Sequence, residues 1–166
     1  FGDGEIDCVI AKEAFHHWPR PMLGLYEMLR VARKAILLIE PYDVMHTVAT
    51  PLPQPGSFCD DYEEVGNYKY QISLREIIKS AWSLYYPAVA AVGFNDPYAP
   101  DRSVDEWLLE KSKLDALGDA GERQFNLMTI AIYKPGHAPD PGALPPRAHL
   151  YRRPANPFTE ASGAAD

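Results

Sequence analysis

Two adjacent histidines, His16 and His17, are the residues of this sequence best suited to acid–base chemistry. An imidazole titrates near neutral pH, so either ring could act as general base toward a hydroxyl group of a substrate. A structural histidine that hydrogen-bonds the backbone of its loop is an alternative for one of the two. A zinc site is disfavoured, because cysteine and carboxylate partners do not stand at ligand spacing beside them. The prediction is therefore a catalytic loop that holds no metal.

Charged and aromatic residues also follow two short apolar segments, residues 6–11 and 35–39, which have the pattern of strands. They are Lys12 and Glu13 after the first segment, and Glu40, Tyr42 and Asp43 after the second. Ligands of open α/β sheets bind outside the carboxyl ends of the strands, so all five residues are candidates for ligand contact. The first two could equally form an ion pair that orients the loop. The last three could equally form only the turn that ends the strand.

The element between these two strands is an amphipathic helix that begins near Pro21. Its apolar residues are Met22, Leu25, Tyr26, Leu29 and Ala32, which lie on one face at helical spacing. Proline suits the first helical position, because its missing N–H would have no partner there. Two strands joined by a helix predict a right-handed parallel crossover. Continuous rather than alternating hydrophobicity predicts strands covered on both faces, with Cys8 as a buried thiol.

The rest of the chain predicts two more helices and two more strands. Residues 44–71 contain Pro51, Pro53 and Pro55 and form a long loop, of the kind that acts as a lid or binding loop. Ser-x-x-Glu capping boxes start both helices. The predicted elements are helices over residues 74–85 and from Ser103 to near Gly118, and strands over residues 88–94 and 124–133. The proline-rich residues 135–166 predict a disordered tail.

Residues 5–43 resemble the class I methyltransferases that use S-adenosylmethionine, in the group called type 11. The matching features are Asp7 before an apolar strand, the loop residues His17-Trp18-Pro19, the helix end Glu27-Met28-Leu29-Arg30-Val31, and the strand that follows from Ile36 to Ile39. In that family they belong to the fourth strand, fourth helix and fifth strand. The family's last strand is antiparallel between the two strands before it. The resemblance implies an α/β fold over residues 1–134: a partial, doubly wound Rossmann-like sheet that comprises strands 4 to 7.

The same resemblance implies transfer of a methyl group from S-adenosylmethionine to a small-molecule acceptor. Lys12 and Glu13 would line the methionine part of the cofactor, His17 would be the family's loop histidine, and His16 its more variable neighbour. The Gly-rich and acidic cofactor motifs of the family, and a strand that pairs with residues 6–11, are expected upstream of Phe1. This chain alone is therefore expected to be inactive. Two other interpretations stay open: half of a nicotinamide-dependent oxidoreductase, and a non-catalytic interaction domain.

Composition limits the partners of this 166-residue chain. A formal net charge of −7 disfavours nucleic acid, because phosphate binding needs a basic face. Apolar runs are shorter than the roughly 20 residues that span a bilayer, so no membrane partner is expected. Cys8 and Cys59 do not form a C-x-x-C pair, which favours free thiols in a reducing, cytoplasmic compartment. The expected partner is the small-molecule acceptor; the sequence does not determine the oligomeric state.

Overall fold

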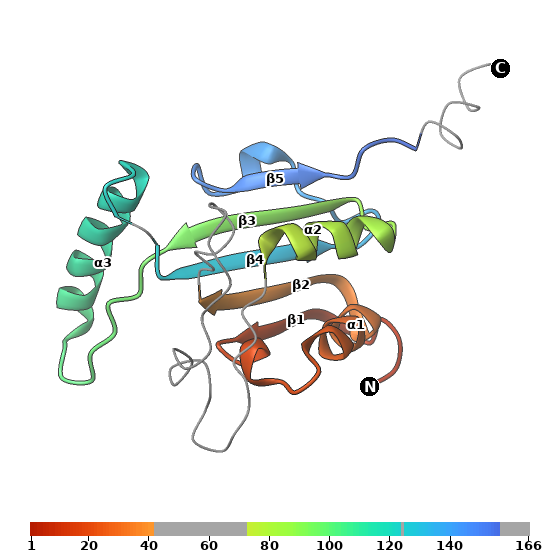
Figure 1. The fold of residues 1–166 in the computed structure, drawn as a ribbon, viewed down its shortest axis with the longest axis horizontal. Helices are drawn as coiled ribbons and strands as arrows, with labels where there is room; N and C mark the ends of the chain where they lie inside the picture. Colours follow the sequence, from red (N-terminus) through yellow and green to blue (C-terminus); the bar gives the residue numbers. More distant parts are fainter. Residues whose placement is uncertain (42–72, 124, 157–166) are drawn as a thin grey trace, which may run out of the picture.

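The computed structural model describes residues 1–41, 73–123 and 125–156 (Figure 1). The chain order of its elements is β1 (Ile6–Lys12), the 3-10 helix η1 (Phe15–His17), α1 (Pro21–Val31), β2 (Ala32–Pro41), α2 (Leu74–Ser83), β3 (Ala88–Phe94), α3 (Val104–Asp119), β4 (Leu127–Tyr133), the 3-10 helix η4 (Pro141–Ala143) and β5 (His149–Arg152). In this described part, none of the helices is long and apolar enough to cross a membrane.

The strands form one mixed five-stranded sheet in the order β1-β2-β4-β3-β5. β1 and β2 are parallel, as the predicted crossover requires. β4 lies antiparallel between β2 and β3, so the predicted place and direction of the strand near residues 124–133 are confirmed. The fold is thus a mixed α/β fold with a mixed five-stranded sheet, consistent with the Rossmann-like class. In the described part, the two helices that pack on the core, α1 and α2, lie on the same face of the sheet (Figure 1), so the predicted doubly wound arrangement is not observed there.

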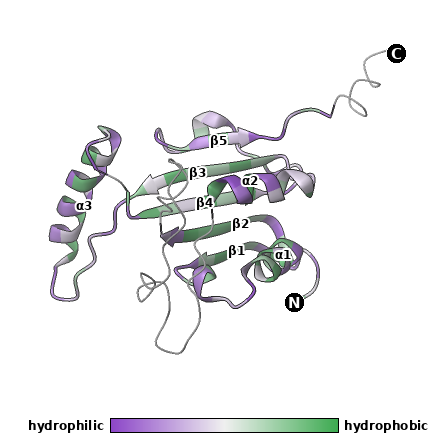
Figure 2. Ribbon diagram, viewed as in Figure 1, coloured by the Kyte–Doolittle hydropathy of each residue, from purple (hydrophilic) through white to green (hydrophobic). Residues whose placement is uncertain are grey.

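One face of the sheet carries the hydrophobic core, and α1 and α2 both cover this face (Figure 1). In β2 the inward positions alternate, so that Ile36 and Leu38 are fully buried. Leu25 of α1 and Ile77 of α2 pack onto them and are equally buried. Figure 2 shows that hydrophobic residues gather on the strands, whereas hydrophilic and hydrophobic residues alternate along α3. α3 lies beyond the carboxyl end of β3 rather than over the core face (Figure 1).

The predicted helix starts agree with the structure. Pro21 occupies the first turn of α1. The Ser73 hydroxyl accepts a hydrogen bond of 2.9 Å from the backbone N–H of Glu76 at the start of α2. Ser103 and Glu106 form a complete reciprocal capping box at the start of α3. These caps satisfy backbone groups that the first turn of a helix leaves without partners.

The prediction of a disordered tail over residues 135–166 is wrong for residues 135–156. This segment contains η4, and β5 extends the sheet by pairing antiparallel with β3. Arg147 ties the segment to α3 through ion pairs with Asp115 and Asp119, at 3.3 and 3.4 Å. A proline-rich composition offers little apolar surface for folding, but backbone pairing with the edge of β3 requires no apolar side chains. Residues 157–166 lie outside the described part.

The prediction of a buried Cys8 in a strand covered on both faces is also wrong. β1 forms one edge of the sheet, and in the described residues its only strand partner is β2. The Cys8 side chain is exposed, and Ile10 is 60% exposed. A continuous apolar run cannot distinguish a central strand from an edge strand, because the difference depends on which elements cover it.

Candidate functional site

The most specific polar contact in the structure joins His16 to Glu40, at the carboxyl ends of the parallel strands β1 and β2. The Nδ1 atom of His16 lies 2.5 Å from Oε2 of Glu40. The other carboxylate oxygen, Oε1, accepts hydrogen bonds from the backbone N–H groups of Ala14 and Phe15, at 3.2 and 3.0 Å. The Glu40 carboxylate therefore holds both the imidazole of His16 and the backbone of the loop that carries His16.

Glu40 reaches this position because it continues the inward-facing side of β2. Ile36, Leu38 and Glu40 alternate along the strand, and the whole Glu40 residue is only 2% exposed. A buried carboxylate without partners would be strongly destabilising, so the three donors from the loop are required. A carboxylate at an inward position of an otherwise apolar strand is the sequence signal for this arrangement. From sequence, Glu40 was a candidate either for substrate contact or for the turn that ends the strand, whereas its geometry is that of a residue that positions His16.

The imidazole of His16 has one nitrogen left for chemistry. Nδ1 faces Glu40, and a carboxylate accepts hydrogen bonds, so Nδ1 is the donor in this contact. In the neutral ring Nε2 is then the acceptor nitrogen, and a general base needs such an acceptor. The His16 side chain is 14% exposed, so the ring is largely shielded but still reachable.

His17, the histidine preferred from sequence, is next to the His16–Glu40 pair. The two imidazole rings lie 3.9 Å apart between centroids, with an angle of 42° between their planes. The described charged partner of His16 is the buried carboxylate of Glu40. The assignment of His17 as the principal base remains a prediction, and the geometry favours His16 for that role.

Lys12 and Glu13 lie at the end of β1, beside the same loop. Their side chains form an ion pair with 3.7 Å between Nζ and Oε2, and they are 55% and 48% exposed. The Glu13 backbone has a φ of +45°, and its N–H donates to the carbonyl of Ile39 at 2.7 Å. A left-handed conformation at a non-glycine residue costs of order 1 kcal/mol and is often found at functional sites. The ion pair expected as one alternative is therefore present, and both groups remain accessible to a ligand.

Aromatic packing also holds in place the loop that carries His16. Phe15 is fully buried, and its ring centroid lies 5.2 Å from that of Trp18. Trp18 in turn lies against Gly24 of α1, where a Cβ atom would come within 2.2 Å of the indole ring. The glycine thus permits a close approach of helix and loop. Tyr42 and Asp43, the remaining predicted substrate contacts, lie outside the described residues.

The carboxyl end of β3 is the third strand end that could contact a ligand. Asn95, the residue that follows β3, has a structural role there. Asn95 is 1% exposed, and its Nδ2 donates to the carbonyl of Leu114 at 3.1 Å. Its backbone N–H donates to the carboxylate of Asp115 at 2.7 Å. These bonds attach the end of the strand to α3. Within the described part of the chain, no group of three or more histidine, cysteine, aspartate or glutamate side chains could hold a metal ion.

Comparison of this chain with family models, with curated proteins and with solved structures found no match. The functional conclusion therefore depends on the geometry of the site and on the resemblance of residues 5–43 described above. The feature that carries most weight is the buried contact between His16 and Glu40.

Proposed function

We propose that this chain takes part in methyl transfer from S-adenosylmethionine to a small-molecule acceptor. The observation that carries the proposal is the His16 imidazole, held by the buried Glu40 carboxylate at the carboxyl ends of two parallel strands. This edge is where open α/β sheets bind their ligands. The antiparallel position of β4 between β2 and β3 gives further support, because it matches the arrangement that the resemblance implied.

The role of His16 in this reaction is to remove a proton from the acceptor. Its Nε2 atom would accept the proton of the acceptor hydroxyl, while bound S-adenosylmethionine would supply the methyl group and leave as a neutral thioether when the carbon–sulfur bond breaks. Glu40 selects the neutral tautomer in which the proton is on Nδ1, holds the ring in one orientation and stabilises the positive charge that the imidazole gains. The buried backbone contacts of Glu40 with Ala14 and Phe15 keep this carboxylate from following the ring into solvent.

The residues at the end of β1 fit the methionine part of the cofactor. S-adenosylmethionine, when bound, supplies a methyl group on a positively charged sulfur. Glu13 would hold the cationic amino group of the methionine part, since its carboxylate is 48% exposed at the strand end. Lys12 would hold the carboxylate of the same part. The ion pair of 3.7 Å between the two side chains would open as each takes its oppositely charged partner.

The identity of the cofactor is tested by calorimetry. The complete protein is titrated with S-adenosylmethionine and, separately, with nicotinamide dinucleotides. Saturable binding of the first ligand alone is expected. Saturable binding of a nicotinamide dinucleotide alone would instead favour a nicotinamide-dependent oxidoreductase. Binding of neither ligand would favour an interaction domain.

The role of His16 is tested by transfer of a labelled methyl group to a panel of phenols, alcohols and amines. His16→Gln should lower turnover roughly 100- to 10,000-fold, the usual contribution of general acid–base catalysis, with the affinity for S-adenosylmethionine unchanged. His17→Gln is the matched control and should have the smaller effect. A larger loss in the His17 variant would reverse the assignment of the base.

A further inference from the structure

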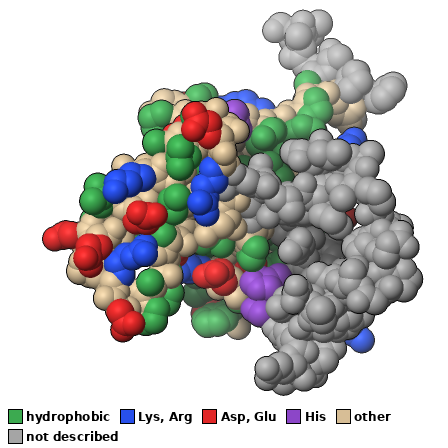
Figure 3. Space-filling view, turned by 60° about the vertical axis from the view of Figure 1, so that its left-hand side comes forward, with side chains coloured by type: hydrophobic (Ala, Val, Ile, Leu, Met, Phe, Trp, Pro, Cys, Tyr) green, Lys and Arg blue, Asp and Glu red, His purple; other side chains and the backbone are tan. Residues whose placement is uncertain are grey.

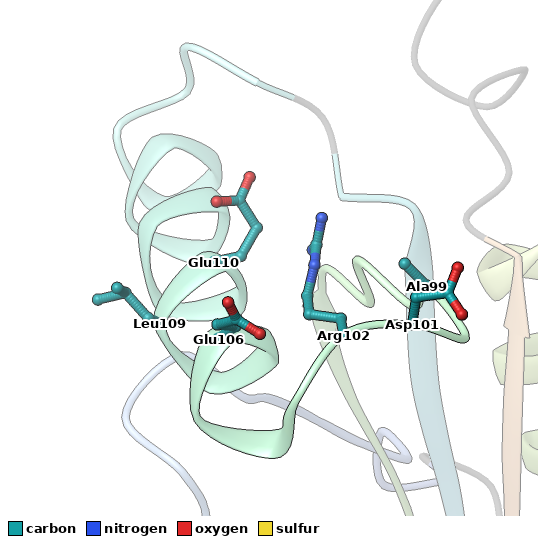
Figure 4. A pocket seen from close by; sticks show the side chains of 6 residues that line it. All are labelled: Ala99, Asp101, Arg102, Glu106, Leu109 and Glu110. Carbon is teal, nitrogen blue, oxygen red and sulfur yellow. The ribbon is translucent and has the colours of Figure 1, made fainter.

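A second candidate binding site lies between the end of β3 and the start of α3, apart from His16 and Glu40. A cavity of about 240 Å³ is lined there by Asp96, Tyr98, Arg102 and Trp107, among others. Arg102 also lines an adjoining cavity of about 430 Å³, together with Glu106 and Glu110 of α3. Figure 4 shows Arg102 extending into the space between its loop and the side chains of these two glutamates. Arg102 and Ala99 therefore line both cavities.

The wall of the smaller cavity is held in place before any ligand binds. The indole N–H of Trp107 donates to a carboxylate oxygen of Asp96 at 2.8 Å. The side chain of Asn126 accepts from the backbone N–H of Asp96 at 2.9 Å and donates to its carbonyl at 3.0 Å. One guanidinium nitrogen of Arg102 donates to the carbonyl of Pro97 at 2.9 Å. Preorganised polar groups lower the entropic cost of binding.

The chemistry of the lining favours a neutral ligand with many hydroxyl groups. Asp96, Glu106 and Glu110 offer hydrogen-bond acceptors, while Arg102 has further N–H donors. An anion would be repelled by the carboxylates, which outnumber the guanidinium, and a cation would leave the N–H groups of Arg102 without an acceptor. A hydroxyl group both donates and accepts, so it can satisfy both kinds of partner. Figure 3 shows acidic and basic side chains intermixed on this end of the molecule.

The aromatic residues supply the remaining part of the recognition. Tyr98 is 77% exposed, and Trp107 lines the same cavity. Aromatic rings present large apolar surfaces with a polar handle, and such surfaces suit the C–H faces of a sugar ring. The volume of 240 Å³ is below the roughly 300 Å³ at which cavities for drug-sized ligands begin, so a single ring is the appropriate size. We propose that this site binds the neutral sugar ring of a glycoside.

Sugar binding at this site does not depend on the proposed methyl transfer. In the sheet, β2 and β4 separate β1 from β3. At about 4.8 Å per strand, the end of β3 lies roughly 14 Å from the end of β1, where His16 is located. A sugar ring bound here would not contact His16 itself. If both proposals hold, the ring is the remote end of a longer methyl acceptor.

The test is saturation-transfer difference NMR on the complete protein, without S-adenosylmethionine. The probes are the methyl glycosides of glucose, galactose and mannose at millimolar concentration, with sodium acetate and tetramethylammonium chloride as charged comparisons. At least one glycoside should bind saturably and more tightly than either ion. Tyr98→Ala should weaken this binding about two- to tenfold, the range expected for one aromatic contact.

The control is Tyr26→Ala, because Tyr26 is a 45% exposed tyrosine on the remote helix α1. This variant should bind glycosides as the unmodified protein does. Urea unfolding of both variants verifies that the fold is retained. Absence of saturable glycoside binding, tighter binding of either ion, or equal effects of the two substitutions would each overturn the sugar site. None of these results depends on whether the protein transfers methyl groups.

Discussion

Replacement of Glu40 by glutamine is the sharpest test of how His16 is held. The glutamine side-chain oxygen can still accept from the backbone N–H groups of Ala14 and Phe15, which now lie 3.2 and 3.0 Å from Oε1. Its amide group would then donate to Nδ1 of His16 instead of accepting from it. The imidazole must move its proton to Nε2 to accept that bond. Glu40→Gln should therefore retain the fold but remove the general base.

The size of the effect on stability follows from the burial of the three contacts. Charge-assisted hydrogen bonds contribute about 1.5–3 kcal/mol and neutral ones about 0.5–1.5 kcal/mol, so Glu40→Gln should lower the free energy of unfolding by roughly 1–2 kcal/mol. Glu40→Ala is more severe, because it leaves the N–H of Phe15 and the ring of His16 without their partner. Removing one member of a buried polar pair costs about 3–5 kcal/mol. The two variants should therefore differ by about 1–4 kcal/mol in the free energy of unfolding.

Two measurements check these expectations. Urea unfolding, followed by the fluorescence of the tryptophans, gives the free energy of unfolding for each variant. The ¹⁵N shifts of the His16 ring show which nitrogen carries the proton, at a pH where the ring is neutral. We expect the proton on Nδ1 in the unmodified protein and on Nε2 in Glu40→Gln. The reasoning is refuted if Glu40→Ala costs less than about 1 kcal/mol, or if the tautomer is the same in both proteins.

Three further predictions concern the elements that support the site. Gly24→Ala should destabilise the protein, because the new Cβ atom would lie 2.2 Å from Trp18. The overpacking cost of about 1–3 kcal/mol exceeds the gain of about 1 kcal/mol in helix propensity. Leu23→Ala, at a 58% exposed position, is the control, and a higher stability of Gly24→Ala in urea would contradict the prediction. Ser73→Ala removes the cap of α2 and should lower the free energy of unfolding by about 0.5–2 kcal/mol. Ser73→Asn can still cap the helix, so it should lower the free energy of unfolding by less. Equal losses in the two variants would argue against capping. Burial alone would raise the pKa of Asp115. This effect is outweighed by hydrogen bonds from Lys111 and from the backbone of Asn95, and by the charges of Lys111 and Arg147. The pKa therefore lies below its usual value of 3.8. A lowered folded-state pKa stabilises the protein above the unfolded value, and this stabilisation is lost as the pH falls through the folded value. Unfolding at neutral pH and near pH 3 should therefore show a smaller loss with acid in Asp115→Asn than in the unmodified protein, and an equal loss would exclude Asp115 as the source.

The sequence by itself determined the local elements and their order. Periodic apolar residues and Pro21 marked α1, and the Ser-x-x-Glu boxes marked the starts of α2 and α3. These signals are reliable because they act between residues three or four positions apart. The parallel crossover followed from two apolar strands and the helix between them, since the connection leaves little choice of direction.

Sequence also identified the loop that carries the candidate site, but not the contact that organises it. His16 and Glu40 are 24 positions apart. Their meeting requires β2 to pair with β1 in the observed register and Glu40 to lie on the inward side of its strand. A shift of one residue would turn Glu40 to the opposite face and leave the loop without its acceptor. The role of Glu40 as a positioning residue thus depends on the register of two strands.

Tertiary structure alone decided the edge of the sheet that β5 forms and the exposure of one face of β1. β5 is a short segment of modest hydrophobicity, and it becomes a strand only because the edge of β3 offers backbone partners. Cys8 and Ile10 are apolar residues in a strand, yet they are exposed because they lie on the face of β1 opposite to Ala11 and the core. Whether an apolar residue is buried depends on which elements cover it. That covering is set by contacts distant in sequence, which a local pattern of residues does not encode.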